Sequence, residues 1–310
     1  MALSIQILIT GLAAGAVYGV FAVAYALIYR LTGVIHFALG ELANASVFTV
    51  LWIAAGTGPV TQTNVPGLRY AVAIGVAALV SIVAGVVTYG AAVRPFRRAR
   101  SAIGWIGGIV ALAFLVRSVL AAAFVRSGYV LPDIVPFERI GSGGVIEIAG
   151  VSVRLQSFFV VVVGIALAAG AAWILASTKW GRALRAITAD ETGARLTGVP
   201  VDRALAIAFA GAGLLAMLAA LATLPGGTVT VDSGAMLGLK GLVAAVLGRF
   251  ALPWGAFVGG LALGLLEAVV VNLHLGPVRL GAPYAAVIPL AAVIVILAAR
   301  AWSGRRAVVE

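Results

Sequence analysis

Long runs of apolar residues constrain this chain more than any other feature of its sequence. Nine such runs follow one another along the 310 residues, and most approach the ~20 residues that a helix needs to cross a bilayer. The expected spans are residues 5–29, 34–55, 70–93, 102–125, 157–177, 204–224, 236–247, 256–273 and 284–299. The sequence therefore predicts an all-α membrane protein in which residues 1–310 form one transmembrane domain, a polytopic helical bundle of about nine spans (roughly 8–10).

Two of these spans are expected to be broken helices. The run at 236–247 is short and contains glycine, and the run at 34–55 is preceded by an interrupted stretch at residues 32–36. Unwound backbone is tolerated at membrane depth only where it is buried in protein or faces a cavity. We therefore expect both interruptions to have a role beyond crossing the bilayer.

The overall composition excludes a water-soluble surface. Hydrophobic residues make up 63% of the chain, charged residues 10%, and the mean hydropathy is +1.16. The net charge of +11 would suit nucleic acid, but the basic residues form short clusters between apolar runs, which indicates membrane topology instead. The chain has no cysteine, which excludes disulfides, thiolate metal sites and cysteine nucleophiles. No basic residue precedes the first run, so we expect it to remain as a helix and not to be a cleaved signal peptide.

Basic residues are distributed unevenly between the two faces of the expected bundle. Nine spans put the termini on opposite sides, and the more basic side is then cytoplasmic. That side would carry Arg30, Arg94, Arg97, Arg98, Arg100, Lys179, Arg182, Arg185, Arg195, Arg203, Arg249, Arg300, Arg305 and Arg306. The other side would carry Arg69, Arg126, Arg139, Arg154 and Arg279. We therefore expect a cytoplasmic C-terminus and an N-terminus outside.

Two loops are long enough to have structure of their own. The extracytoplasmic loop, residues 126–156, contains an alternating segment at 145–148 that predicts a short hairpin with Val151 and Val153, typical of a lid or docking surface. The internal loop, residues 179–203, is rich in Ala, Arg and Leu and is expected to be helical, ending at Gly198-Val199-Pro200.

Glycine is spaced regularly in the first and eighth spans. Gly11, Gly15 and Gly19 recur every fourth residue, as do Gly255 with Gly259 and Gly260 with Gly264. Small residues at this spacing allow two helix backbones to approach closely in a membrane. Glycine is also common in this chain, with 39 residues, but the regular spacing favours helix packing against protein.

No catalytic motif is visible in the sequence. There is no His-Glu-x-x-His pattern, no nucleophile elbow and no phosphate-binding Gly-x-x-x-x-Gly-Lys-Ser/Thr sequence. An energy-coupled transporter would therefore obtain its nucleotidase from another chain.

Polar residues within apolar runs are the remaining candidates, because ionisable groups at membrane depth are costly and usually functional. They are Glu41, Asn44, Arg117, Lys240, Glu267 and Asn272. Glu41 either caps the broken backbone nearby or contacts a substrate. Lys240 and Glu267 form either a structural ion pair or a gate. Arg117 would be uninformative if its side chain reaches the interface.

Two interpretations of the internal loop, residues 179–203, remain open. It is an ordinary basic cytoplasmic loop, or it carries a short helix with the small residue Ala194 and a terminating Gly198, as needed to seat in the groove of a partner ATPase. The second reading depends on a family resemblance.

The chain resembles permease subunits of the branched-chain amino acid class of ABC importers, over nearly its whole length. His36-Phe37-Ala38-Leu39-Gly40-Glu41 is similar to the family's Asn-Phe-Ala-x-Gly-Glu signature, and the first span is similar through Gly15, Tyr18, Gly19 and Ala22. The loop similarity comprises Gly181, Arg182, Ala183, Asp190, Ala194, Leu196, Gly198, Asp202 and Arg203. The C-terminal similarity comprises Met236, Gly238, Lys240, Ala244 to Gly248, Pro253, Gly255, Gly259, Gly260, Gly264 and Glu267. His36 in place of asparagine, Leu39, and Arg249-Phe250 after Gly248 depart from the pattern and leave the cargo open among branched-chain and other amino acids, amides and urea.

The resemblance implies a multi-pass permease in a bacterial inner membrane that performs no covalent chemistry and binds no cofactor. ATP and Mg²⁺ would be used by two cytoplasmic ATP-binding subunits, and further partners would be a homologous second permease and an extracytoplasmic solute-binding protein. Pathway residues are expected at His36, Phe37, Gly40, Glu41, Asn44, Met236, Lys240 and Glu267. ATPase coupling is expected at Gly181, Arg182, Asp190, Glu191, Ala194, Leu196 and Gly198.

Two other classes compete with the importer. A secondary transporter or channel for a small polar solute would need a coupling site, for which the chain offers only Glu41 and Glu267 as acidic candidates. A membrane-embedded enzyme is disfavoured because catalytic motifs are absent.

Overall fold

The computed structural model describes residues 2–56, 67–98, 102–126, 128–130, 144–148, 151–223, 227–251, 253–272, 274–275 and 278–279, with the isolated residues 287 and 291. The expected span at 284–299, apart from those two residues, and the basic C-terminal segment lie outside the described residues.

Six long helices in the described part of the chain are apolar enough to cross a membrane. They are α1 (Ala2–Thr32), α3 (Gly67–Val87) with its continuation, α5 (Ala102–Ala123), α6 (Leu155–Ser177), α9 (Val201–Thr223) and α11 (Trp254–Val271). Two shorter apolar helices, α2 (Leu39–Ala55) and α10 (Ser233–Leu247), match the two runs expected to be broken. The prediction of an α-helical membrane bundle with short helices is confirmed.

Several expected boundaries were wrong, among them those of the second, third and seventh spans. The second span begins at Leu39 and not at residue 34, because Gly33 has a φ of 73° and its amide bonds to the Tyr29 carbonyl, which ends α1. The third continues beyond residue 93, since α3 passes through a π-helix, η1 (Thr88–Val93), into α4 (Arg94–Arg98). The seventh begins at Ser233 instead of residue 236.

The loops have the elements that were expected of them, with small shifts at their ends. β2 (Val145–Ile148) pairs antiparallel with β3 (Val151–Arg154), as predicted. The internal loop consists of α7 (Lys179–Ala189) and α8 (Glu191–Leu196), and α9 already begins at Val201, before the predicted end at residue 203. Three short strand pairings complete the described part: that hairpin, β1 (Tyr129–Val130) with β4 (Thr228–Val229), and β5 (His274–Leu275) with β6 (Val278–Arg279).

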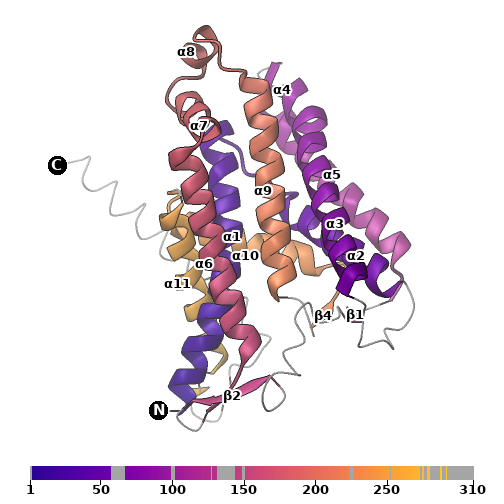
Figure 1. Cartoon of the computed structure of the whole chain (residues 1–310), viewed down its shortest axis with the longest axis vertical. Coiled ribbons are helices and arrows are strands. Elements are labelled where there is room, and N and C mark those ends of the chain that lie inside the picture. Colours follow the sequence, from indigo (N-terminus) through magenta and orange to yellow (C-terminus); the bar gives the residue numbers. More distant parts are fainter. Residues whose placement is uncertain are drawn as a thin grey trace, which may run out of the picture.

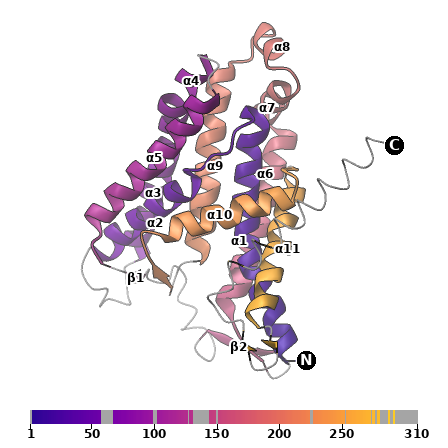
Figure 2. The same cartoon turned by 180° about the vertical axis from the view of Figure 1, so that it is seen from behind.

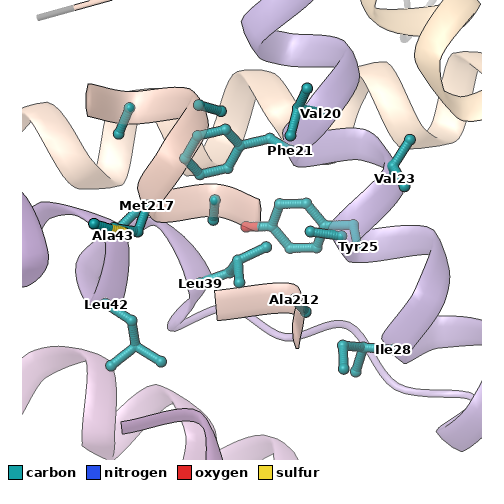
Figure 3. Packing of buried hydrophobic residues seen from close by; sticks show 14 of the residues in the cluster. Val20, Phe21, Val23, Tyr25, Ile28, Leu39, Leu42, Ala43, Ala212 and Met217 are labelled. Carbon is teal, nitrogen blue, oxygen red and sulfur yellow. The ribbon is translucent and has the colours of Figure 1, made fainter. Parts of the chain in front are cut away.

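α1 is the central helix of the bundle. It contacts α6, α9, α10 and α11, while α3 packs on α9 and α2 lies between α3 and α10. From Ala16 to Ile28 every residue of α1 is buried, and Figure 3 shows Phe21 and Tyr25 of α1 facing Leu39 and Ala43 of α2 and Met217 of α9. The core therefore lies where α1, α2 and α9 meet.

The two ends of the bundle differ, and α10 lies between them. Figure 1 shows α4, α7 and α8 at one end and the N-terminus with β2 at the other. The basic residues of α4 and α7 are therefore at the same end. In Figure 2, α10 runs across α1 instead of along it, near mid-height of the bundle.

Candidate functional site

A cavity of about 300 Å³ lies beneath the transverse helix α10. Its walls come from α1, α2, α9 and α10, and most of the lining is apolar, with a few polar groups among it. The lining residues are Ala14, Val17, Tyr18, Gly40, Ala43, Asn44, Ala220, Thr223, Ser233, Gly234, Met236, Leu237 and Lys240. The cavity thus joins the two broken spans that the sequence singled out.

A polar network borders this cavity. The Lys240 ammonium donates to Glu267 Oε1 (2.6 Å) and to the Tyr18 hydroxyl (3.0 Å), and that hydroxyl donates to Glu267 Oε2 (2.8 Å). The Lys240 and Glu267 side chains are 17% and 15% exposed. Each polar atom of the triangle has a partner, which offsets much of the cost of holding two charges at membrane depth. The ion pair that was one of two readings for Lys240 and Glu267 is therefore present, and it joins α10, α11 and α1.

The start of α2 is fixed to α10 by close backbone contact. A Cβ atom on Gly40 would lie 2.2 Å from the Gly234 carbonyl oxygen and 2.9 Å from Gly238 Cα. The Asn44 side chain donates to the carbonyls of Thr230 (3.2 Å) and Val231 (2.9 Å) in the segment that leads into α10. These contacts hold one wall of the cavity rigidly in place.

The predicted pathway residues divide into two groups. Gly40, Asn44, Met236 and Lys240 line the cavity, and Glu267 is bonded to Lys240. His36, Phe37 and Glu41 are not among the lining residues.

The three residues away from the cavity have different surroundings. The His36 ring is 1% exposed, lies 5.2 Å from the Phe209 ring, and its two nitrogens have no hydrogen-bond partner among the described residues. Phe37 is 45% exposed. Glu41 is buried, and within the described part of the chain its Oε2 has no hydrogen-bond partner, so the structure gives no support to a capping role for that atom.

The glycine ladders lie at helix contacts. A Cβ on Gly260 would lie 2.1 Å from the Gly19 nitrogen, and one on Gly264 would lie 2.3 Å from the Gly15 nitrogen. Gly11 of α1 also faces α11, where a Cβ on Gly11 would lie 3.0 Å from Leu265 Cα. Gly255 and Gly259 of α11 face the end of α10 instead. A Cβ on Gly259 would lie 2.3 Å from the Ala244 carbonyl oxygen, and one on Gly248 would lie 2.4 Å from the Gly255 carbonyl oxygen.

At the basic end, α7 is an amphipathic helix that covers the end of α6. Gly181, Leu184 and Ile187 are buried on one face, and the Thr178 hydroxyl caps the helix by accepting from the Gly181 amide (3.0 Å). A Cβ on Gly181 would lie 2.3 Å from the Leu175 carbonyl oxygen, so only glycine allows this approach. Arg182 is exposed and donates to the Ser177 carbonyl (3.4 Å).

The short helix α8 projects furthest from the bundle in Figure 1. The Asp190 carboxylate caps it by accepting from the Thr192 amide (2.9 Å), and Gly198, with φ of 84°, ends the turn that follows it. Ala194 is 4% exposed and packs inward, whereas Leu196 is 85% exposed. Of these two side chains, Leu196 and not Ala194 is therefore the exposed one.

Charged contacts tie α8 to the helices beside it. Glu191 accepts from Arg97 of α4 and, at 3.0 Å, from Arg195. The hydrogen bond to Glu191 raises the pKa of the Arg195 guanidinium, so that group stays charged. Asp202, at the start of α9, accepts from the Tyr89 hydroxyl of η1 (2.6 Å).

Comparison with known proteins decides the family. The family model described as "Branched-chain amino acid transport system / permease component" matches residues 7–297. The chain belongs to this permease family. It is 28% identical over 268 residues to the high-affinity branched-chain amino acid transport system permease protein BraD of Pseudomonas aeruginosa, covering 85% of each chain. It is 29% identical over 300 residues to the permease protein LivH of Escherichia coli K12, covering 94% of this chain and 92% of the relative.

Membership makes this chain a multi-pass membrane permease whose role is transport and not catalysis. The described residues contain no group of three or more His, Asp or Glu side chains arranged to hold a metal ion. The polar groups that border the cavity form a hydrogen-bonded ion pair, which agrees with a transport role.

Several contacts in and around the candidate site were not predicted from the sequence. Tyr18 was noted only through the resemblance, because a tyrosine in an apolar helix has no distinctive pattern. Arg97 pairs with Glu191 across 94 positions, which no local spacing reveals. Arg117 pairs with Asp232 near the start of α10 and is thus a specific contact instead of an uninformative interfacial arginine.

Proposed function

We propose that this permease forms one half of the membrane channel of an ATP-driven importer in a bacterial inner membrane. Its cargo would be branched-chain amino acids or a related small amino acid or amide. The description of the family and the names of the relatives support this cargo class. The second half of the channel would be a homologous permease, either a different chain or a second copy.

The cavity beneath α10 supports the proposed pathway more than any other observation. Its apolar walls suit an aliphatic side chain. The oxygen atoms of Asn44, Thr223 and Ser233, whose side chains also bond within the chain, would accept from the ammonium group of an amino acid. The Lys240–Glu267 pair makes no net contribution of charge, which suits a zwitterion better than an ion.

The segment from α7 to α8 is proposed to contact the ATPases. It combines an exposed Leu196 with a framework of caps and ion pairs that would transmit a push on α8 to α4 and α9. Two ATP-binding subunits, using ATP and Mg²⁺, would act here on the cytoplasmic side. This orientation puts the N-terminus outside with the hairpin β2–β3, where an extracytoplasmic binding protein would dock.

Reconstitution with the co-encoded partners tests the proposal. Proteoliposomes containing both permeases and both ATPases, supplied with the binding protein, are expected to accumulate radiolabelled leucine only when ATP is present on the ATPase side. The matched control contains an ATPase variant that binds ATP without hydrolysing it. Uptake that ignores ATP and follows an ion gradient would overturn the importer proposal in favour of a secondary transporter.

The cargo is tested separately. The ligand retained by the co-encoded binding protein after purification should be an aliphatic amino acid or amide by mass spectrometry. A sugar or an ion there would refute the cargo while leaving ATP-driven transport intact.

A further inference from the structure

A second cavity, of about 490 Å³, lies at the basic end of the bundle, where α7 folds over the ends of α1 and α6. Leu27 and Leu31 of α1, Ala172 and Leu175 of α6 and Leu184 of α7 supply apolar walls. Arg30, Arg185 and Thr188 supply its polar part. This groove is separate from the cavity beneath α10, with which it shares no lining residue.

The groove holds positive charge that its own walls do not neutralise. Its described lining contains no carboxylate. Arg185 donates to the carbonyls of Leu175 and Ala176 at the end of α6, so its position is fixed by neutral partners. The Arg30 side chain is exposed and makes no hydrogen bond or ion pair with the described residues. The polar part of the groove therefore favours an anion.

Exposed aromatic residues adjoin this groove along the chain. Tyr29 and Trp173 each adjoin a groove residue in sequence and are 37% and 65% exposed. Trp180 at the start of α7 and Trp254 beside the groove residue Pro253 are 44% and 48% exposed. Because exposed Trp and Tyr gather at the membrane–water interface, these neighbours favour a groove that lies near the lipid headgroups.

We propose that the groove binds an anionic phospholipid. The headgroup phosphate would accept hydrogen bonds from Arg30 and from the N–H groups of Arg185 that do not bond Leu175 and Ala176. An acyl chain would lie along Leu27, Leu31 and Ala172. A free phosphate would satisfy the arginines but leave these apolar walls uncovered, whereas a lipid satisfies both. The bound lipid would link α1, α6 and α7, and so would help to hold the segment proposed to contact the ATPases. The site itself does not depend on the cargo or on the ATPases.

Native mass spectrometry of the assembled complex tests the site with two lipids. Phosphatidylglycerol is expected to be retained more strongly than phosphatidylcholine of the same acyl chains. Arg30→Gln should weaken phosphatidylglycerol binding about fivefold, since a basic residue near the surface contributes on the order of 1 kcal/mol to such binding. The matched control is Arg154→Gln, which removes the same charge from the opposite end of the bundle and should leave binding unchanged.

A second variant and a competitor identify the occupant. Ala172→Phe keeps the charge but fills the apolar part of the groove, and it should reduce retention of phosphatidylglycerol, while excess inorganic phosphate should displace little lipid. Equal retention of the two lipids, or equal effects of Arg30→Gln and Arg154→Gln, would overturn the proposal. Full retention in Ala172→Phe together with displacement by inorganic phosphate would identify a free-anion site and overturn the lipid assignment.

Discussion

At the scale of single residues, Lys240 is the clearest example of a charge made tolerable by its neighbours. Its ammonium contacts Glu267 and Tyr18 and also lies 5.2 Å from the centre of the Tyr18 ring. Removing one member of such a network leaves the other charge without its partner at membrane depth. The cost then comes more from the remaining charge than from the lost bond.

We predict that Lys240→Met and Glu267→Gln each lower the free energy of unfolding by about 3 kcal/mol. The double variant should lose clearly less than the sum, because neither charge is left alone. Thermal unfolding in one detergent measures all three, with Leu239→Met on the exposed face of α10 as the control. Strictly additive losses would mean that the two side chains are not coupled.

Arg249 and Phe250 show strain at the turn between α10 and α11. Both have positive φ, 55° and 50°, a region that costs roughly 1–2 kcal/mol for a residue with a side chain. These two residues depart from the family pattern, and their φ values are ones that glycine would adopt at less cost. Phe250 recovers part of the cost by stacking on Tyr29, with ring centroids 4.2 Å apart.

Arg249→Gly is therefore expected to raise the free energy of unfolding by about 1 kcal/mol. Phe250→Gly relieves similar strain but loses the stacking, so it should gain less or become destabilising. Paired melting curves compare the two variants. A destabilised Arg249→Gly would show that the arginine makes contacts worth more than the strain.

At the scale of elements, the contact between α1 and α11 depends on the absence of side chains. The glycines of both helices let backbone atoms meet directly, and membrane helices gain little from hydrophobic burial against lipid. A methyl group on Gly264 has no space, whereas one on Gly75 of α3 meets nothing within 4 Å.

Gly264→Ala should lower the free energy of unfolding by about 2 kcal/mol or more, because α1 and α11 must separate. Gly75→Ala should be neutral or slightly stabilising, since alanine is the better helix former. Both are read by thermal unfolding of the purified protein. Equal melting temperatures for the two variants would contradict the packing account.

The second element-scale prediction concerns the link between α8 and α4. Arg97→Glu and Glu191→Arg each place like charges together, so each should reduce the amount of substrate transported per ATP hydrolysed severalfold. The exchanged pair Arg97→Glu with Glu191→Arg should recover part of it, with Arg195 limiting the recovery because it also contacts position 191. An exchanged pair no better than either single variant would argue that this contact does not transmit the movement.

At the scale of the whole molecule, the apolar runs predicted the bundle well because hydrocarbon leaves the backbone few alternatives to a helix. The start of α2 was missed because Val34, Ile35 and Phe37 are as apolar as a helix while their backbone is unwound. The orientation of α10 was equally hidden, since a mostly apolar helix of 15 residues can lie along its neighbours or run across them.

The candidate site could be predicted only in part for a similar reason. The position of Lys240 and Glu267 within apolar runs was enough to suggest a pair. The walls of the cavity depend on how α1, α2, α9 and α10 cross, which is a property of the assembled bundle, and His36 and Glu41 were expected there but lie elsewhere. The sequence pattern thus identified the ionisable side chains within the membrane, but not the cavity that the helices form around some of them.

The central claim is that the cavity beneath α10 is the pathway, and the absence of cysteine in the chain allows a direct measurement. Thr223 and Ser233 line the cavity, and each is replaced singly by cysteine. Val162→Cys, at a position on α6 that is 65% exposed, is the lipid-facing control. We predict that a water-soluble thiol reagent modifies the two cavity cysteines on the order of tenfold faster than the control, because thiolates form only where water enters. Their reaction rates should also change when a non-hydrolysable ATP analogue is added to the assembled complex. Cavity cysteines that react no faster than Val162→Cys in a complex that still transports would contradict the account.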